Sequence, residues 1–159
     1  MLPRARIKRG RGGEVRLRLP DDERELIQLL CGELRARVDD ERDHPDLRRL
    51  FPPAHADDQE AEDEYRRLTG SQLDTGRERA LDTVEATIDA GTLTAEEAEA
   101  WLRVLNDLRL VLGTRLDVTE DLDWDLRPGD PRAPELGVYA YLSWLQEQLV
   151  VTLAAGLER

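Results

Sequence analysis

Several residue types are scarce in this chain of 159 residues, and each scarcity excludes a class of protein. A single cysteine, Cys31, cannot form an internal disulfide, so the chain is not a secreted domain held together by disulfides. The two histidines, His44 and His55, do not have zinc-site spacing with that thiol. No apolar run approaches the roughly 20 residues of a membrane span, and the basic N-terminus lacks the apolar segment of a signal peptide. These absences predict a cytoplasmic protein that holds no metal or cofactor and does not enter a membrane.

Sequence patterns of catalysis are missing as well. Ser71 and Ser143 do not lie in the strand-turn-helix context of a nucleophile elbow. The glycines of residues 10–13 precede a strand-like segment rather than a helix, and no Lys-Ser or Lys-Thr pair follows them, so they do not form a phosphate loop. We therefore predict that the chain is not an enzyme.

Acidic residues are scarce at the N-terminus, whereas in the rest of the chain acidic residues outnumber basic residues. The formal net charge is −12, and Lys8 is the only lysine beside 22 arginines. Residues 1–18 carry seven basic side chains and one acidic side chain, a formal charge of +6, whereas the remainder carries −18. This asymmetry predicts either two surfaces with different partners or a basic segment that contacts the chain's own acids.

The basic segment has the pattern of a β-hairpin. In residues 4–19, RARIKRGRGGEVRLRL, apolar and basic side chains alternate on both sides of a glycine-rich turn. The hairpin at 1–19 is therefore expected to have an apolar face on the protein and a basic face of Arg6, Lys8, Arg16 and Arg18. That basic face is a candidate site for an acidic protein, for the chain's own acids or for nucleic acid, although it has no aromatic side chain to stack on bases.

Helical periodicity dominates the rest of the chain. It predicts helices from residue 20 to 38, from the acidic run at 57–64 to near Gly70, and at 71–90, 94–116 and 136–155. Acidic linkers are expected near 39–64 and 117–135. The sequence thus predicts a single domain, 1–159, with a helical body at 20–159. Its fold class is mainly α, a bundle of four to six helices with a small N-terminal β-hairpin, and helices 94–116 and 136–155 are its core pair.

Two of these helices carry further candidate site residues. The last helix is apolar around most of its circumference, which is typical of a central core helix or of one shared in a homodimer. Trp144 and Gln148 on it are candidates for binding a partner. Cys31 lies on the apolar stripe of the first helix, which favours a buried core thiol over a redox-sensing thiol.

Two segments resemble a known family. AEAWLRVLNDLRLVLGTRLDV at 98–118 and VYAYLSWLQEQLVVTL at 138–153 are similar to the actinobacterial domain-of-unknown-function family labelled aerobic and oxidative stress regulator. The resemblance implies a cytoplasmic bacterial regulator, typically encoded beside the ClpS adaptor, that acts on transcription through a sigma factor or RNA polymerase. Direct binding to DNA and an adaptor role with a Clp component are the alternatives.

The resemblance also implies a redox element, a cysteine pair in a CxxxC motif. Here the chain departs from the family, because Arg35 stands four residues after Cys31 and no second cysteine is present. An intramolecular disulfide switch is therefore impossible in this chain. A thiol switch at Cys31 would have to be intermolecular or of the sulfenic-acid type.

Overall fold

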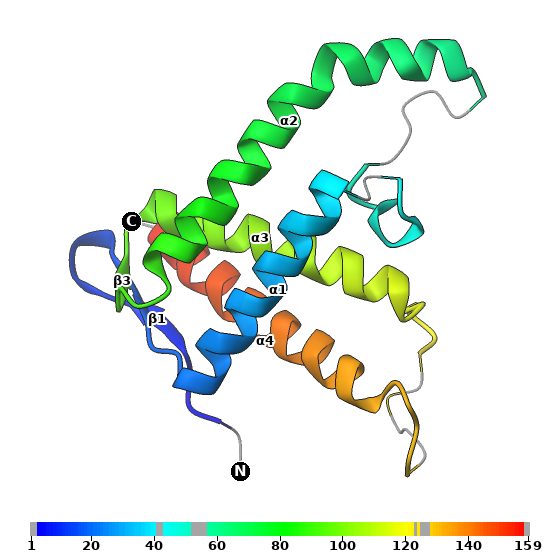
Figure 1. Cartoon of the computed structure of the whole chain (residues 1–159). Coiled ribbons are helices and arrows are strands. Elements are labelled where there is room, and N and C mark those ends of the chain that lie inside the picture. The colour runs from blue at the N-terminus through cyan, green and yellow to red at the C-terminus, as the bar shows by residue number, and fades with distance from the viewer. Residues whose placement is uncertain (1–2, 41–42, 52–56, 123, 125–127, 158–159) are drawn as a thin grey trace.

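The chain is described by a computed structural model covering residues 3–40, 43–51, 57–122, 124 and 128–157. Four α-helices and a small antiparallel sheet occupy these ranges and confirm the predicted mainly helical class (Figure 1). In chain order the elements are β1 (Ile7–Arg9), the 3₁₀ turn η1 (Arg11–Gly13), β2 (Val15–Leu17), α1 (Asp21–Asp40), the 3₁₀ turn η2 (Pro45–Leu47), α2 (Gln59–Thr87), β3 (Thr92–Leu93), α3 (Ala95–Arg115) and α4 (Ala133–Leu157).

Helix α3 begins where its local sequence predicts. Thr94 accepts the backbone N–H of Glu97 at 3.1 Å, and the Glu97 carboxylate accepts the backbone N–H of Thr94 at 2.8 Å. This reciprocal capping box satisfies two N–H groups that an uncapped helix start leaves without partners. Helix α1 follows Pro20 and has three acids in its first turn, which favour the positive end of the helix dipole.

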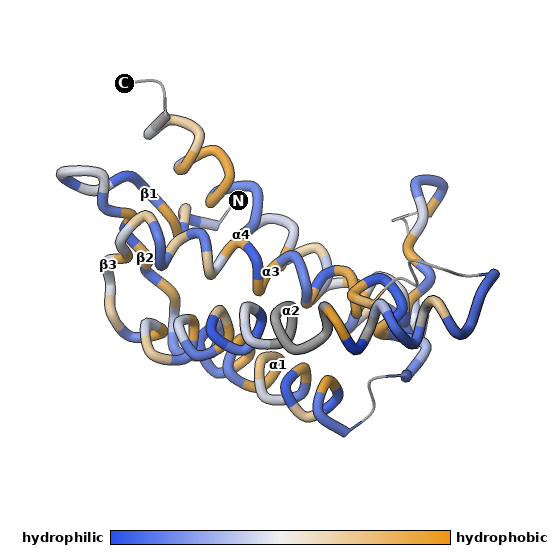
Figure 2. Tube along the Cα trace, turned by 90° about the horizontal axis from the view of Figure 1, so that it is seen from above, coloured by the Kyte–Doolittle hydropathy of each residue, from blue (hydrophilic) through white to orange (hydrophobic). Residues whose placement is uncertain are grey.

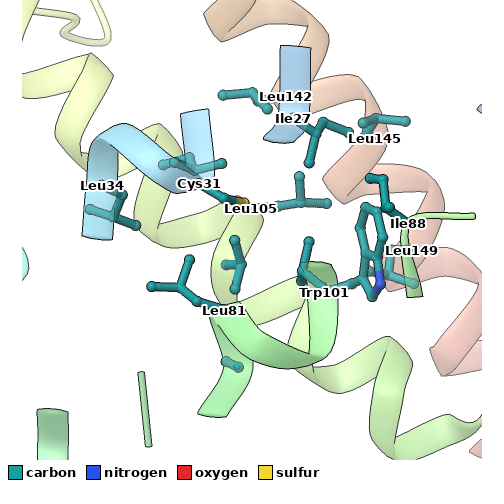
Figure 3. Close-up of a cluster of buried hydrophobic side chains, with 14 of the residues drawn as sticks. Ile27, Cys31, Leu34, Leu81, Ile88, Trp101, Leu105, Leu142, Leu145 and Leu149 are labelled. Atoms are coloured by element: carbon teal, nitrogen blue, oxygen red, sulfur yellow. The ribbon is translucent and has the colours of Figure 1, made fainter. Parts of the chain in front are cut away.

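The core lies where α3 meets the other helices. Helix α3 contacts α2, α4 and α1, so it is the central helix of the bundle. Figure 3 shows side chains from all four helices meeting in one apolar cluster. Its members include Ile27, Cys31 and Leu34 of α1, Leu81 of α2, Ile88 just after α2, Trp101 and Leu105 of α3, and Leu142, Leu145 and Leu149 of α4.

Helix α2 differs most from prediction. The sequence predicted two helices separated near Gly70, but one helix runs from Gln59 to Thr87. The predicted acidic linker near 39–64 is correspondingly shorter, since α1 extends to Asp40 and α2 begins inside the acidic run. The prediction failed because a glycine inside a helix costs only about 1 kcal/mol relative to alanine and is not an obligatory stop.

The N-terminal hairpin is confirmed and gains a third strand. Strands β1 and β2 are antiparallel, with Ile7 opposite Leu17 and Lys8 opposite Arg16. Strand β3, which the sequence did not predict, pairs with β2 after the chain turns at Gly91, whose φ is +77°. A positive φ favours glycine because it has no Cβ. The buried side chains Ile7, Val15, Leu17 and Leu93 turn the sheet's apolar face to the helices.

One ion pair is buried inside the helical body. Nε of Arg77 on α2 donates to Oδ2 of Asp107 on α3 at 2.9 Å, and the two side chains are only 10% and 8% exposed. The Arg77 guanidinium also lies 4.8 Å from the centre of the Phe51 ring. The pair thus joins α2 to α3 at the point where α2 leaves the body.

Candidate functional site

The outward face of the sheet is a cluster of positive charge. We call Lys8, Arg16 and Arg18 the basic face; all three side chains are exposed. Lys8 and Arg16 stand directly opposite each other across β1 and β2, an arrangement of like charges that destabilises a sheet. Within the described residues, none of the three forms an ion pair. A strongly acidic chain therefore presents a basic surface that forms no ion pair with the carboxylates of the described residues.

Gln148 fixes this sheet to the last helix. Its Oε1 accepts the backbone N–H of Arg6 at 2.8 Å and the backbone N–H of Ile7 at 3.1 Å. These bonds satisfy donors along the outer side of β1 and block the edge against further strand pairing. Gln148, predicted to bind a partner, thus anchors the hairpin on α4.

Arg6 differs from the other predicted basic residues because its charge is neutralised. Its guanidinium donates to both carboxylate oxygens of Glu23 on α1, with Nη2 2.8 Å from Oε2. It also lies 5.4 Å from the ring centroid of Trp144, a cation–π contact. The hydrogen bond to Glu23 raises the pKa of Arg6. Arg6 and the half-buried Trp144 therefore join the hairpin to α1 and α4.

Glu23 is a site residue that sequence reasoning missed. Burial is the largest single influence on Glu23 and opposes its ionisation, but the hydrogen bonds from Arg6 and Tyr141 and the charge of Arg6 together lower the pKa of Glu23. The neighbouring Tyr141 hydroxyl is buried beside Glu23, and burial, followed by its interaction with the Glu23 carboxylate, raises the pKa of Tyr141. An acid in a first helical turn indicates favourable helix-dipole electrostatics, so no local signal distinguished Glu23 from its neighbours.

The six predicted contact residues therefore form two groups. Arg6, Trp144 and Gln148 make a junction in which each is held by other parts of the chain. Lys8, Arg16 and Arg18 point outward from the rigid sheet that this junction supports. The arrangement can present positive charge at fixed spacing to an acidic surface. In the described ranges, no group of three or more His, Cys, Asp or Glu side chains is placed to hold a metal ion.

The family model for Domain of unknown function (DUF2017) matches residues 4–153, which includes the sheet, all of α1 to α3 and most of α4. This chain belongs to the DUF2017 family. The match extends over both segments that carry the resemblance and over the hairpin.

Curated relatives of this DUF2017 chain share one description. The oxidative stress regulator AosR of Mycobacterium tuberculosis strain H37Rv is 32% identical over 126 residues, which cover 69% of this chain and 58% of that protein. The Mycobacterium bovis protein of the same name has the same values. A putative oxidative stress regulator AosR of Mycobacterium leprae is 36% identical over 78 residues, covering 49% of this chain and 36% of that protein. No solved structure matches the chain.

The DUF2017 chain therefore spans less than two thirds of the length of the curated relatives that it matches. None of the helices in the described part of the chain combines the length and the apolarity that a membrane span requires.

The structure places Cys31 in the core of this DUF2017 chain. The residue is 0% exposed and lies between Ile27 and Leu34 on the inner face of α1 (Figure 3). Burial raises the pKa of the Cys31 thiol to about 12. The charge of Glu85 adds a smaller increase, and the charge of Arg35 acts in the opposite direction. Thiol reactivity needs a thiolate and access to solvent, and this environment provides neither.

We expect Cys31 to be almost inert toward alkylation in the folded protein. A pKa raised from 9.0 to about 12 lowers the thiolate fraction at pH 8 roughly a thousandfold, and burial slows the reaction further. Iodoacetamide labelling followed by mass spectrometry, with the urea-unfolded chain as reference, measures the ratio. Labelling of the folded chain at a rate near that of the unfolded chain would restore the redox-sensing hypothesis.

The cavity between α1, α3 and α4 is an unpromising ligand site. It encloses about 40 Å³ among apolar side chains that include Leu34, Leu108 and Leu142. The cations at its mouth, Arg37 and Arg115, both already donate to Oδ2 of Asp46, at 3.1 and 3.2 Å. This space is too small for a metabolite, and its two cations are paired.

Polar residues between α3 and α4 bind one another. Arg109 donates to Ser143 at 2.9 Å and to Gln146 at 2.5 Å, and Gln146 in turn donates to Asn106 at 3.4 Å. This half-buried network joins the two helices.

Proposed function

We propose that this chain is a non-enzymatic regulator of stress-linked transcription that acts by protein–protein contact, with a sigma factor or RNA polymerase as the partner. The names of the relatives support the stress-regulatory role. The single structural observation that carries the mode of action is the un-neutralised basic face, held rigidly on α4 by Gln148. Such a face fits an acidic protein segment of similar size.

Charge favours a protein partner over duplex DNA. The basic face is formed by strands of three residues each, and the rest of the chain carries a formal charge of −18. A duplex would extend beyond the face and meet those acids within about one Debye length, roughly 8 Å at physiological salt. A short acidic segment can contact the face alone. Direct DNA binding stays the second candidate, since two-stranded ribbons with basic side chains do enter the grooves of DNA.

The test is a charge reversal on the basic face. Binding of the purified chain to the sigma factors and RNA polymerase of its host is measured by biolayer interferometry, with generic duplex DNA in parallel. For Arg16→Glu/Arg18→Glu we expect at least about a tenfold loss of protein affinity, because attraction becomes repulsion at the contact. The matched control is Arg48→Glu/Arg79→Glu, which makes the same change of net charge at exposed helical and turn positions.

Each other outcome rejects the proposal. If the two double variants bind the partner equally well, the basic face does not take part in partner binding. If the chain binds neither a sigma factor nor RNA polymerase, the proposed partner is wrong. DNA binding that falls steeply with salt and disappears in Arg16→Glu/Arg18→Glu would establish the second candidate. Recovery of Clp components from host lysate by the wild type alone would favour the adaptor role.

A further inference from the structure

The first part of helix α2 differs from the rest of the helix in the burial of its described side chains. Of the side chains described between Gln59 and Gly76, none is buried, whereas burial begins at Arg77 and continues to Thr87. At 1.5 Å per residue, these 18 residues make about 27 Å of helix. Figure 1 shows this part of α2 running away from the other helices. We call residues 57–76 the acidic arm.

The acidic arm exposes both an apolar side chain and acids, as a helix that binds another surface does. Leu68 is 72% exposed, the highest exposure among the large apolar side chains described. Exposed acids lie N-terminal to it in the arm, at Asp57, Asp58, Glu60, Asp63 and Glu64, while its neighbour Arg67 is an exposed base. Isolated helices of this length are marginal in water, and Gly70 and Gly76 weaken this one further. Contact with another surface would stabilise the arm.

The complementary surface lies at the opposite end of the same chain. The basic face has no ion-pair partner in the part of the chain that the structure describes, and the sheet lies far from the start of α2 (Figure 1). One turn of α4 beyond the Gln148 anchor, Val151 is 62% exposed, and Val150 is 46% exposed. Figure 2 shows that these last, hydrophobic turns of α4 project past the hairpin. Basic and apolar groups thus occur together at this end, as acidic and apolar groups do on the arm.

We infer that two copies of this chain associate antiparallel, with the acidic arm of each lying on the basic face and the exposed valines of the other. Opposite charge at the two ends of one elongated molecule favours this side-by-side arrangement. It uses both surfaces twice and closes with two-fold symmetry, so no open filament forms. Leu68 would lose its exposure to water against the valines, and the acids of the arm would neutralise Lys8, Arg16 and Arg18.

The inference stands apart from the proposed function but has a consequence for it. The dimer would cover the basic face, so self-association and binding to an acidic partner would compete for one surface. A rise in chain concentration would then weaken partner binding. Self-association is measured without any partner, so its failure would leave the proposed function intact.

Reversing the charges of the basic face or of the acidic arm tests the inference directly. Mass is measured by light scattering after size exclusion, over a wide concentration range and at low and high salt. We expect a dimer for the wild type and at least about a tenfold weaker dimer for Arg16→Glu/Arg18→Glu and for Glu60→Lys/Glu64→Lys. Circular dichroism confirms that each variant keeps its helices.

Two variants that each add one negative charge distinguish loss of the Leu68 contact from the effect of net charge. Leu68→Asp is expected to weaken the dimer, whereas Leu29→Asp, at a leucine on α1 that is 60% exposed, is expected to leave it unchanged. A wild type that is monomeric at every concentration overturns the inference. A dimer that survives the reversals would place the interface elsewhere, for example along α4.

Discussion

Asp107→Ala is expected to lower the free energy of unfolding by about 3–5 kcal/mol, because it leaves the Arg77 guanidinium buried without its counter-charge. The Arg77 side chain is only 10% exposed, and its Nη1 already lacks a hydrogen-bond partner. With Asp107 removed, the Nε–H loses its acceptor as well, while the Phe51 ring still faces the cation. Urea unfolding followed by circular dichroism gives the change.

Two comparisons make this expectation specific. Arg77→Met/Asp107→Leu removes both charges and fills similar volume, so its stability is expected to lie near or above that of the wild type. Arg35→Ala breaks exposed pairs with Asp82 and Glu85 and is expected to cost less than about 1 kcal/mol. A loss of less than about 1 kcal/mol for Asp107→Ala would mean that water reaches Arg77.

Trp101→Ala is expected to lower the free energy of unfolding by about 3–5 kcal/mol, the usual range for truncating a buried aromatic residue. Trp101 is 1% exposed in the cluster of Figure 3, where side chains of all four helices meet. Its indole N–H also donates to Oγ1 of Thr87, the last residue of α2, at 2.8 Å. The substitution therefore removes both a large apolar volume and a link between α2 and α3.

Trp101→Phe separates these two contributions. It keeps most of the apolar volume but loses the indole donor, and Thr87 keeps its hydrogen bond to the carbonyl of Thr83 at 2.6 Å. We expect a loss of about 1–2 kcal/mol, from the missing hydrogen bond and a small cavity. Thermal and urea unfolding of both variants provide the test. Equal losses for the two substitutions would show that volume at this position contributes little.

Local sequence was sufficient for the elements whose signals lie within a few residues. The capping box of Thr94 and Glu97 and the apolar stripe of α3 predicted that helix to within about one residue at each end. Alternation in residues 4–19 predicted both strands of the hairpin and the outward direction of Lys8, Arg16 and Arg18. Period and capping depend on neighbours in sequence, so they can be read without the fold.

The continuity of α2 could not be read in that way. Glycine, threonine and serine near Gly70 lower helix propensity by small amounts, and those amounts predicted a break. Strand β3 was also missed, since two residues carry no periodicity and Thr92–Leu93 becomes a strand only by pairing with β2. Whether α2 is continuous depends on the summed energy of the whole helix. Whether Thr92–Leu93 forms a strand depends on pairing with β2, which is distant in sequence.

By itself, the sequence determined the helical class, the basic hairpin and the positions of most helices, because hydrophobic period, capping and charge are local properties. Only the tertiary structure decided which candidate residues are free. Contacts across more than 140 positions make Gln148 an anchor of β1, and packing of α1 against α2, α3 and α4 buries Cys31. Burial and pairing between distant segments are properties of the packed chain, so the division into a fixed junction and an exposed basic face appears only when the helices have met.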